Sequence, residues 1–418
     1  MDQDHELRFF IGRQPILDLK QEIIGYELLF RAAGHHETAQ FESQTQASAS
    51  VIASALSGFG FQEVLGDKFG FLNITASVLH SEMLELLPIE QSVLEILETI
   101  ELDDNVRLRC QQLKSQGFRI ALDDHVYSPD HASFYKFVDI IKVDIMATDP
   151  EELPVIAAKL RQYPVQLLAE RVETVEQFEQ CVKYGFVLFQ GYFFEKPVVL
   201  GKKRIDSSGL AMMKLLHQLN EDWDIDEVEN TFRENPTLTF NLLKLVNSVM
   251  FSTREKIKNL RHAIMMLGIA HLRRWVQLSL FAGKDERGLN SPLLEMAAVR
   301  ARLLELLTMQ HTGLSRTSDV VEAAFMAGIL SMLDALFETE IDAIVADLNL
   351  SDEVANALLR REGTLGQLLL LAEKLEKTDF TAVQDILEQT GISFDQLLSA
   401  QLDAFNWRNS IVRDQRRA

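Results

Sequence analysis

The first two hundred residues alternate short apolar runs with amphipathic stretches, and this alternation limits the possible folds more than any other feature. The runs have the length and composition of buried strands, and segments between them, such as ELPVIAAKLRQY, have helical spacing. Six such strands and at least one more within residues 8–30 are enough for a (β/α) barrel. The six runs are FGFLNITASVL (69–79), SVLEILETI (92–100), FRIALDD (118–124), DIIKVDI (139–145), VQLLAERVE (165–173) and FVLFQGYFF (186–194).

From about residue 207 the pattern changes to long amphipathic segments without strand-like alternation, such as LRHAIMMLGIAHLRRWVQLSLF and VVEAAFMAGILSMLDALF. This second part is therefore predicted to be all-α. The stretch between the two parts contains Pro197, Gly201 and Gly209 and is typical of a linker. We expect an α/β barrel domain over residues 1–200, a linker at about 198–206 and an all-helical domain over 207–418.

Composition narrows the classes of function. The 62 acidic and 41 basic residues give a formal net charge of −21, which opposes attraction to a phosphate backbone, so direct nucleic-acid binding is not expected. The two cysteines, Cys110 and Cys181, form no CxxC or Cys/His cluster, which is typical of a reducing cytoplasm. The sequence shows no secretion signal and no run near the ~20 apolar residues of a membrane span, so we expect a cytoplasmic protein.

Polar residues near the ends of the predicted strands form a candidate site, because barrel strands bring their carboxyl ends to one rim. Carboxylates gathered there repel one another unless cations are present. A set of oxygen ligands without thiolates suits Mg²⁺, Mn²⁺ or Ca²⁺. A single carboxylate at a strand end is more often simply solvated; the whole set favours a metal. Its members are Glu27, Asn73, Glu95, Glu98, Asp123, Asp124, Lys142, Asp144, Glu170, Glu173 and Gln190.

The order and spacing of these segments resemble the EAL family of cyclic di-GMP phosphodiesterases. GYELLFR (25–31) is similar to the family's signature segment, with Leu28 in place of its alanine. FLN, LEILE, LDD, IKVD, AERVE and FQGYFFEKP follow in the family's order, so the resemblance extends over residues 8–197. It implies a TIM-like barrel that binds cyclic di-GMP and hydrolyses it with Mg²⁺ or Mn²⁺.

The resemblance also implies roles for the matching residues. The metal ligands would be Glu27, Asn73, Glu95, Asp123, Asp124 and Glu170. The catalytic residues would be Glu27, Glu170 and Lys142. Of these, Lys142 would orient the attacking water. The ligand-binding residues would be Gln14, Gln190 and Arg31. Of these, Arg31 would contact a phosphate of the dinucleotide. Glu98 would anchor the loop after LDD.

One departure from the family pattern is the loop after Asp124. It reads HVYSPDHA, without the glycines of the family's Phe-Gly-Thr-Gly-like loop, so it cannot fold in the same way. In the family this segment couples dimerisation to metal occupancy, which makes a homodimer a candidate assembly. His125 and His131 flank the loop, and since no paired-His spacing accompanies them, we expect exposed loop residues.

A second departure is Arg171 in AERVE, where the family has a small residue. A guanidinium there can pair with carboxylates or take the space of a second metal. We expect Arg171 to point towards the barrel mouth and to lie near Asp124 or Glu173.

The helical half resembles the HDOD domain, in the form fused to EAL domains in YuxH-type signalling proteins. The resemblance is carried by ENPTLTFNLLKLVNSVMF (234–251) and the segments after it. Where related HD hydrolases have their His-Asp doublet, GILSMLD has Ser331 and Met332, and neither is a hard-metal ligand. The resemblance implies a non-catalytic module that engages a protein partner.

The sequence leaves the function of the barrel open between an active phosphodiesterase and a receptor. The alternative for the whole chain is a catalytically inactive interaction scaffold or regulator.

Overall fold

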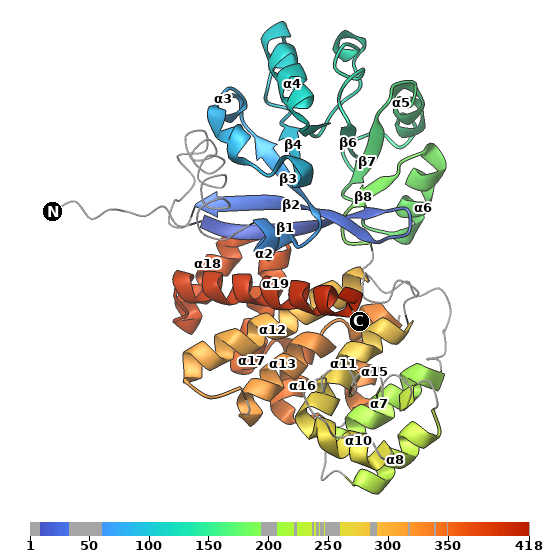
Figure 1. Cartoon of the computed structure of the whole chain (residues 1–418), viewed down its shortest axis with the longest axis vertical. Helices are drawn as coiled ribbons and strands as arrows, with labels where there is room; N and C mark the ends of the chain where they lie inside the picture. Colours follow the sequence, from blue (N-terminus) through green and yellow to red (C-terminus); the bar gives the residue numbers. More distant parts are fainter. Residues whose placement is uncertain are drawn as a thin grey trace, which may run out of the picture. The chain divides into compact units, whose positions relative to one another are not determined.

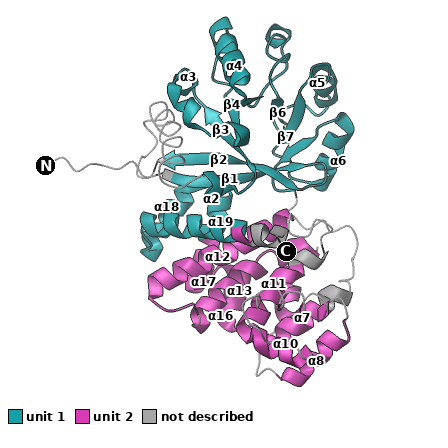
Figure 2. Ribbon diagram, viewed as in Figure 1, with its two compact units in different colours: residues 1–196, 371–409 teal, residues 197–370, 410–418 magenta. Residues whose placement is uncertain are grey.

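The computed structural model describes residues 9–32, 61–193, 207–220, 224–235, 260–284, 291–316, 318–337, 340–348 and 350–417, with Leu238, Thr239, Leu242 and Val246. The chain forms two compact units (Figure 2). The barrel unit contains residues 1–196 and 371–409, and the helical unit contains residues 197–370 and 410–418. The expected linker at 198–206 lies outside the described residues.

Eight strands close into one barrel in chain order, which confirms the predicted fold class of an α/β barrel followed by a helical region (Figure 1). The first two strands form a hairpin, so β1 is antiparallel to both of its neighbours, whereas every other adjacent pair is parallel. The strands are β1 (Phe9–Asp18), β2 (Ile23–Ala32), β3 (Phe69–Ile74), β4 (Ser92–Ile96), β5 (Arg119–Leu122), β6 (Ile140–Asp144), β7 (Gln166–Glu170) and β8 (Leu188–Gln190).

Apolar side chains from seven of these strands fill the barrel interior. Because successive residues of a strand face opposite sides, one set packs inside and the other is buried under the surrounding helices, so the strands read as nearly continuous apolar runs. The interior cluster is Ile16, Phe71, Val93, Ala121, Ile140, Leu168 and Leu188.

The connecting helices begin and end at specific capping residues. Asp103 accepts a hydrogen bond from the Val106 amide at the start of α4 (Asp104–Gln116), which ends at Gly117 with φ 106°. Thr174 and Gln177 form a capping box at the start of α6 (Val175–Tyr184). These caps fix where each helix returns to the next strand. The other helices here are α2 (Phe61–Leu65), α3 (Ala76–Leu79) and α5 (Leu153–Leu160).

The barrel unit also contains the C-terminal segment 371–409. This division differs from the domain expected from the sequence, which placed all of residues 207–418 in the helical half. This segment includes the end of α17 (Gly363–Glu376), all of α18 (Phe380–Thr390) and most of α19 (Phe394–Arg417). The Phe10 ring of β1 lies 5.6 Å from the Phe380 ring and 5.0 Å from the Phe394 ring. In Figure 1, α18 and α19 lie beside the β1–β2 hairpin.

Polar contacts reinforce this packing. The Arg13 guanidinium lies 3.9 Å from the ring centre of Phe405 and 4.0 Å from that of Tyr26, so it is stacked between the two rings. Gln401 donates to the backbone oxygen of Ile11 at 2.9 Å. The C-terminal helices are therefore a structural part of the barrel unit.

The helical unit contains α7 (Ser207–Asn220), α8 (Ile225–Arg233), α10 (Leu260–Leu267), α11 (Ile269–Lys284), α12 (Pro292–Thr312), α13 (Asp319–Leu330), α14 (Leu333–Phe337), α15 (Ile341–Asp347) and α16 (Asp352–Arg360). Helices α12 and α13 cross closely: a Cβ at Gly328 would lie 2.4 Å from Cα of Ala301. The buried Glu305 carboxylate accepts from three guanidinium groups, Arg274, Arg302 and Arg316. None of the helices in the described chain is long and apolar enough to cross a membrane.

We predict that Phe10→Ala lowers the free energy of unfolding of the barrel unit by about 3 kcal/mol, because it removes a buried ring from the contact with Phe380 and Phe394. Urea denaturation of the full chain, followed by circular dichroism, measures the change. The control is Leu108→Ala, whose side chain is 58% exposed and should shift stability by less than ~0.5 kcal/mol. Equal effects of the two substitutions would contradict a stabilising role for this packing.

Candidate active site at the barrel mouth

A buried lysine is the centre of the site. Lys142, on β6, is 1% exposed, and its ammonium contacts carboxylates from four other strands or strand ends. The distances from Nζ are 2.6 Å to Asp123, 2.8 Å to Glu95, 3.0 Å to Glu170 and 3.3 Å to Glu27. Lys142 and four of the predicted carboxylates therefore converge on one mouth of the barrel.

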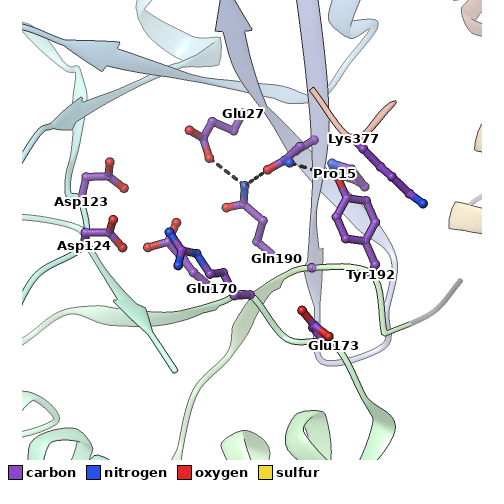
Figure 3. Close-up of a pocket in the computed structure, with 12 residues that line it drawn as sticks. Pro15, Glu27, Asp123, Asp124, Glu170, Glu173, Gln190, Tyr192 and Lys377 are labelled. Atoms are coloured by element: carbon purple, nitrogen blue, oxygen red, sulfur yellow. Dashed lines mark hydrogen bonds between the residues drawn. The ribbon is translucent and has the colours of Figure 1, made fainter. Parts of the chain in front are cut away.

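Amide side chains hold the Glu27 carboxylate in place. Asn73 donates to Oε1 at 3.0 Å, and Gln190 donates to Oε2 at 2.7 Å. The Gln190 amide also donates to Oε1 of Gln14 at 2.8 Å, which joins β8 to β1 (Figure 3). Three side chains, Asn73, Gln190 and Lys142, thus bind the Glu27 carboxylate and fix its orientation.

Burial and charge shift the pKa values in opposite directions. Burial would lower the pKa of Lys142, but the four carboxylates, led by Glu95, hold it well above its usual value. Burial would raise the pKa of Glu27, but Lys142 and the amide donors lower it. Burial raises the pKa of Asp123, that of Glu170 to about 8, and that of Glu95 well above its usual range. One ammonium therefore does not keep all four carboxyl groups ionised at neutral pH.

Several buried oxygens at the mouth have no hydrogen-bond partner, which tests whether a metal fits. They are Oδ1 of Asn73, both carboxylate oxygens of Glu95, Oε2 of Glu170 and Oε1 of Gln190. A Glu95 oxygen still lies within ion-pair distance of Lys142, but not in hydrogen-bond geometry. Hard divalent cations prefer such neutral and anionic oxygens. Yet among the described residues no three His, Cys, Asp or Glu form a ready coordination shell. The donor chemistry fits a divalent metal, while the carboxylates are grouped round Lys142.

A cavity of about 440 Å³ opens at the mouth, within the range of small-molecule sites. Figure 3 shows Asp123, Asp124 and Glu170 on one side of it and Tyr192 and Lys377 on the other. Its described lining residues are Gln14, Pro15, Glu27, Asp123, Asp124, Glu170, Arg171, Glu173, Gln190, Gly191, Tyr192 and Lys377.

Two expected site residues, Arg31 and Glu98, neither line this cavity nor contact Lys142 or Glu27 among the described residues. Arg31 is exposed on β2, is not a lining residue, and its charge acts on Asp379 in the C-terminal segment. Glu98 is exposed in the turn after β4, and its carboxylate makes no hydrogen bond among the described residues. The proposed phosphate contact and loop anchor therefore stay predictions without a supporting contact.

Arg171 lines the cavity together with Asp124 and Glu173, as expected, but its ion pair is with another residue. Its guanidinium lies 3.0 Å from Asp144 at the end of β6, a carboxylate other than the two expected near it. Asp144 also accepts hydrogen bonds from the Met146 and Ala147 amides, which fixes its position. This ion pair holds the guanidinium at the end of β6.

The prediction of exposed loop histidines is wrong for His125, which is buried. Its Nε2 lies 2.8 Å from the hydroxyl of Tyr135, and that hydroxyl also bonds to the backbone of Ser128. The His131 ring is 5.3 Å away. The loop after Asp124 therefore folds round Tyr135 in place of a glycine turn, and the Tyr-containing run that follows the loop was the signal overlooked in the sequence.

Comparison with known proteins agrees with this geometry. Residues 5–197 match the EAL domain model, and residues 208–343 match the HDOD domain model. The Vibrio cholerae serotype O1 protein named cyclic di-GMP phosphodiesterase CdgJ is 33% identical over 408 residues, 97% of this chain and 93% of CdgJ. The chain belongs to the EAL–HDOD family.

A second EAL–HDOD relative, YuxH of Bacillus subtilis, is 29% identical over 415 residues, which are 97% of this chain and 99% of YuxH. Among solved structures, Bacillus subtilis YkuI, described as having an EAL domain in complex with c-di-GMP and calcium, is 20% identical. The match covers 62% of this chain and 72% of that protein, with a TM-score of 0.39.

In the HDOD half of this EAL–HDOD protein, the segment that corresponds to the His-Asp doublet of HD hydrolases contains an arginine contact. The Ser331 hydroxyl at the end of α13 accepts from Arg300 at 2.7 Å, and Met332 is buried in the core. Arg300 also acts electrostatically on Asp334. A guanidinium donates hydrogen bonds and cannot ligate a cation, so these contacts are those of a packed structural site.

We predict that protein stability falls as pH decreases from 6.5 to about 4, in part through His125. Burial, and then the nearby His131, lower the pKa of His125 from 6.5 to about 4. The unfolded chain therefore binds this proton at higher pH than the folded chain does. This difference lowers the free energy of unfolding by up to about 3 kcal/mol near pH 4.

The matched variant is His125→Gln, which offers a non-titrating amide to Tyr135. Its free energy of unfolding, measured by urea denaturation at several pH values, should decline less over this range. Parallel profiles for the two proteins would rule out the His125 contribution.

Proposed function

We propose that the barrel binds cyclic di-GMP and hydrolyses one phosphodiester bond with Mg²⁺ or Mn²⁺. The observation that carries this proposal is the convergence of four carboxylates and Lys142, with unpartnered buried oxygens beside a 440 Å³ cavity. Similarity to CdgJ over nearly its full length supports the same activity. The residues that would hold the metals are Glu27, Asn73, Glu95, Asp123, Asp124 and Glu170.

The bound ions would activate a water and offset charge on the phosphate. The chain's own residues contribute position and a fixed charge. Gln190 and Asn73 orient Glu27. Lys142 would orient the attacking water with one of its three N–H donors once metal ligation draws its carboxylate partners away. In the reaction the water oxygen bonds to phosphorus, the bond to the ribose 3′ oxygen breaks, and the water's proton ends on that oxygen. The product is the linear dinucleotide.

A second candidate is a receptor that binds cyclic di-GMP without turnover. It is favoured by the glycine-free loop, which is fixed by Tyr135, and by carboxylates grouped round Lys142 rather than as a metal shell. Since misplacement of about 1 Å can cost ~10²-fold in rate, such a site could bind and fail to react. In both cases we propose that the HDOD domain engages a protein partner. A purely interacting scaffold would show neither binding nor turnover. A cytoplasmic location and a homodimer stay predictions.

Glu27→Ala should reduce hydrolysis of cyclic di-GMP at least ~10²-fold, because it removes a metal-ligand candidate and leaves Gln190, Asn73 and Lys142 without a common partner. Chromatographic separation of the cyclic and linear dinucleotides measures the rate with Mn²⁺ or Mg²⁺.

The control is Glu90→Ala, an exposed carboxylate remote from the cavity lining, which should keep the unaltered rate. Binding of cyclic di-GMP by the unaltered protein without any linear product would select the receptor. Equal rates for Glu27→Ala and the unaltered chain would refute the proposed site.

Adding Mn²⁺ at pH 7 should release protons. Burial raises the pKa of Glu170 to about 8, so most of this carboxyl is protonated before the metal binds, and metal ligation requires the ionised form. Titration calorimetry in buffers of different ionisation enthalpy counts the protons. Glu170→Gln should release fewer protons than the unaltered protein, and an equal release would assign the proton to another group.

A further inference from the structure

A lysine from the C-terminal segment lies at the cavity. Lys377 follows α17 directly, in the short connection to α18, and it lines the cavity with Gln14 and Tyr192 (Figure 3). It belongs to the same compact unit as the barrel strands. The residue is about 180 positions beyond the EAL domain match, so a barrel cut at residue 197 would lack it.

Hydrogen bonds fix the connection against the barrel wall. The Tyr192 hydroxyl donates to the backbone oxygen of Glu376 at 3.1 Å and lies 3.2 Å from the Gln14 amide. Gln14 in turn accepts from Gln190, which donates to Glu27. One continuous set of hydrogen bonds therefore joins the residue next to Lys377 to a metal-ligand candidate.

Close packing also fixes the connection. A Cβ at Gly12 of β1 would lie 2.6 Å from Cγ2 of Thr378, so this approach needs a glycine. Thr378 itself has φ 54°, a conformation that is costly for a β-branched residue. The surrounding structure holds this turn in one conformation, and with it the Cα of Lys377.

The charges round the cavity single out Lys377. Five of the described lining residues are carboxylates, and two are cations, Arg171 and Lys377. Arg171 pairs with Asp144, whereas Lys377 has no ion pair among the described residues. Lys374, three residues earlier, pairs with Asp379 at 2.8 Å and stabilises the turn instead. Lys377 is thus the lining cation that stays available to an anionic ligand.

We infer that Lys377 binds the phosphate of the cyclic dinucleotide that lies farther from Asp123 and Asp124. This inference rests on the proposed function, since it takes cyclic di-GMP as the ligand. Such a ligand carries two phosphodiesters, and Lys377 lies across the cavity from the two aspartates (Figure 3). Its flexible four-carbon stem lets an exposed ammonium reach a phosphate at the rim. The EAL–HDOD chain then completes its barrel site with a residue from outside the EAL match.

The test compares cyclic di-GMP binding by four full-length proteins, using calorimetry with Ca²⁺ in low-salt buffer. They are the unaltered chain, Lys377→Ala, Lys377→Arg and Lys183→Ala. Lys183 is exposed on α6 and away from the cavity, so its substitution changes the net charge equally. We expect about tenfold weaker binding for Lys377→Ala, near-normal binding for Lys377→Arg and for Lys183→Ala, and a smaller difference in high salt.

The outcomes separate this inference from the function beneath it. If the unaltered chain binds cyclic di-GMP and Lys377→Ala binds it equally well, the role of Lys377 is wrong and the barrel site stands. If Lys183→Ala weakens binding as much as Lys377→Ala, the effect is net charge and the contact is also wrong. If the unaltered chain binds no cyclic di-GMP, both the proposed function and the role of Lys377 fall.

Discussion

The contact of the Lys142 ammonium with four buried carboxylates is the interaction on which the site depends. Each partner comes from a different strand or strand end, so the ion pairs form only when the barrel closes in its full register. Removing the Lys142 charge would leave four buried carboxylates without their cation, which costs far more than breaking a surface pair. Barrel closure and the arrangement of the site are therefore one physical event.

The excess of carboxylates over cations also explains why the site suits metal chemistry. One positive charge among four acids leaves protons on some of them, and a divalent ion would displace those protons. The amide residues Asn73 and Gln190 orient Glu27 without adding charge. The mouth thus combines a fixed ammonium with carboxyl groups whose charge can change.

The sequence predicted the barrel and the convergence of its strand-end residues, because apolar periodicity and parallel strand direction are local properties that place residues such as Glu95 and Lys142 at one rim. It did not predict the partner of Arg171, since Asp144 is one of several carboxylates at that rim and strand geometry alone does not choose among them. Nor did it predict the burial of His125, because this depends on the hydroxyl of Tyr135, ten residues later. Lys377 had no local signal at all, because its place depends on packing between distant segments.

The long-range packing of β1 has a consequence for the order of protein synthesis. Gln401 bonds to Ile11 across 390 residues, and the rings beside Phe10 also come from the last part of the chain. A ribosome must therefore reach Gln401 before the outer side of the β1–β2 hairpin is fully covered. Until then the nascent barrel exposes an apolar surface, the state in which large chains misassemble, and the covering of that surface waits for residues 371–409 to be made.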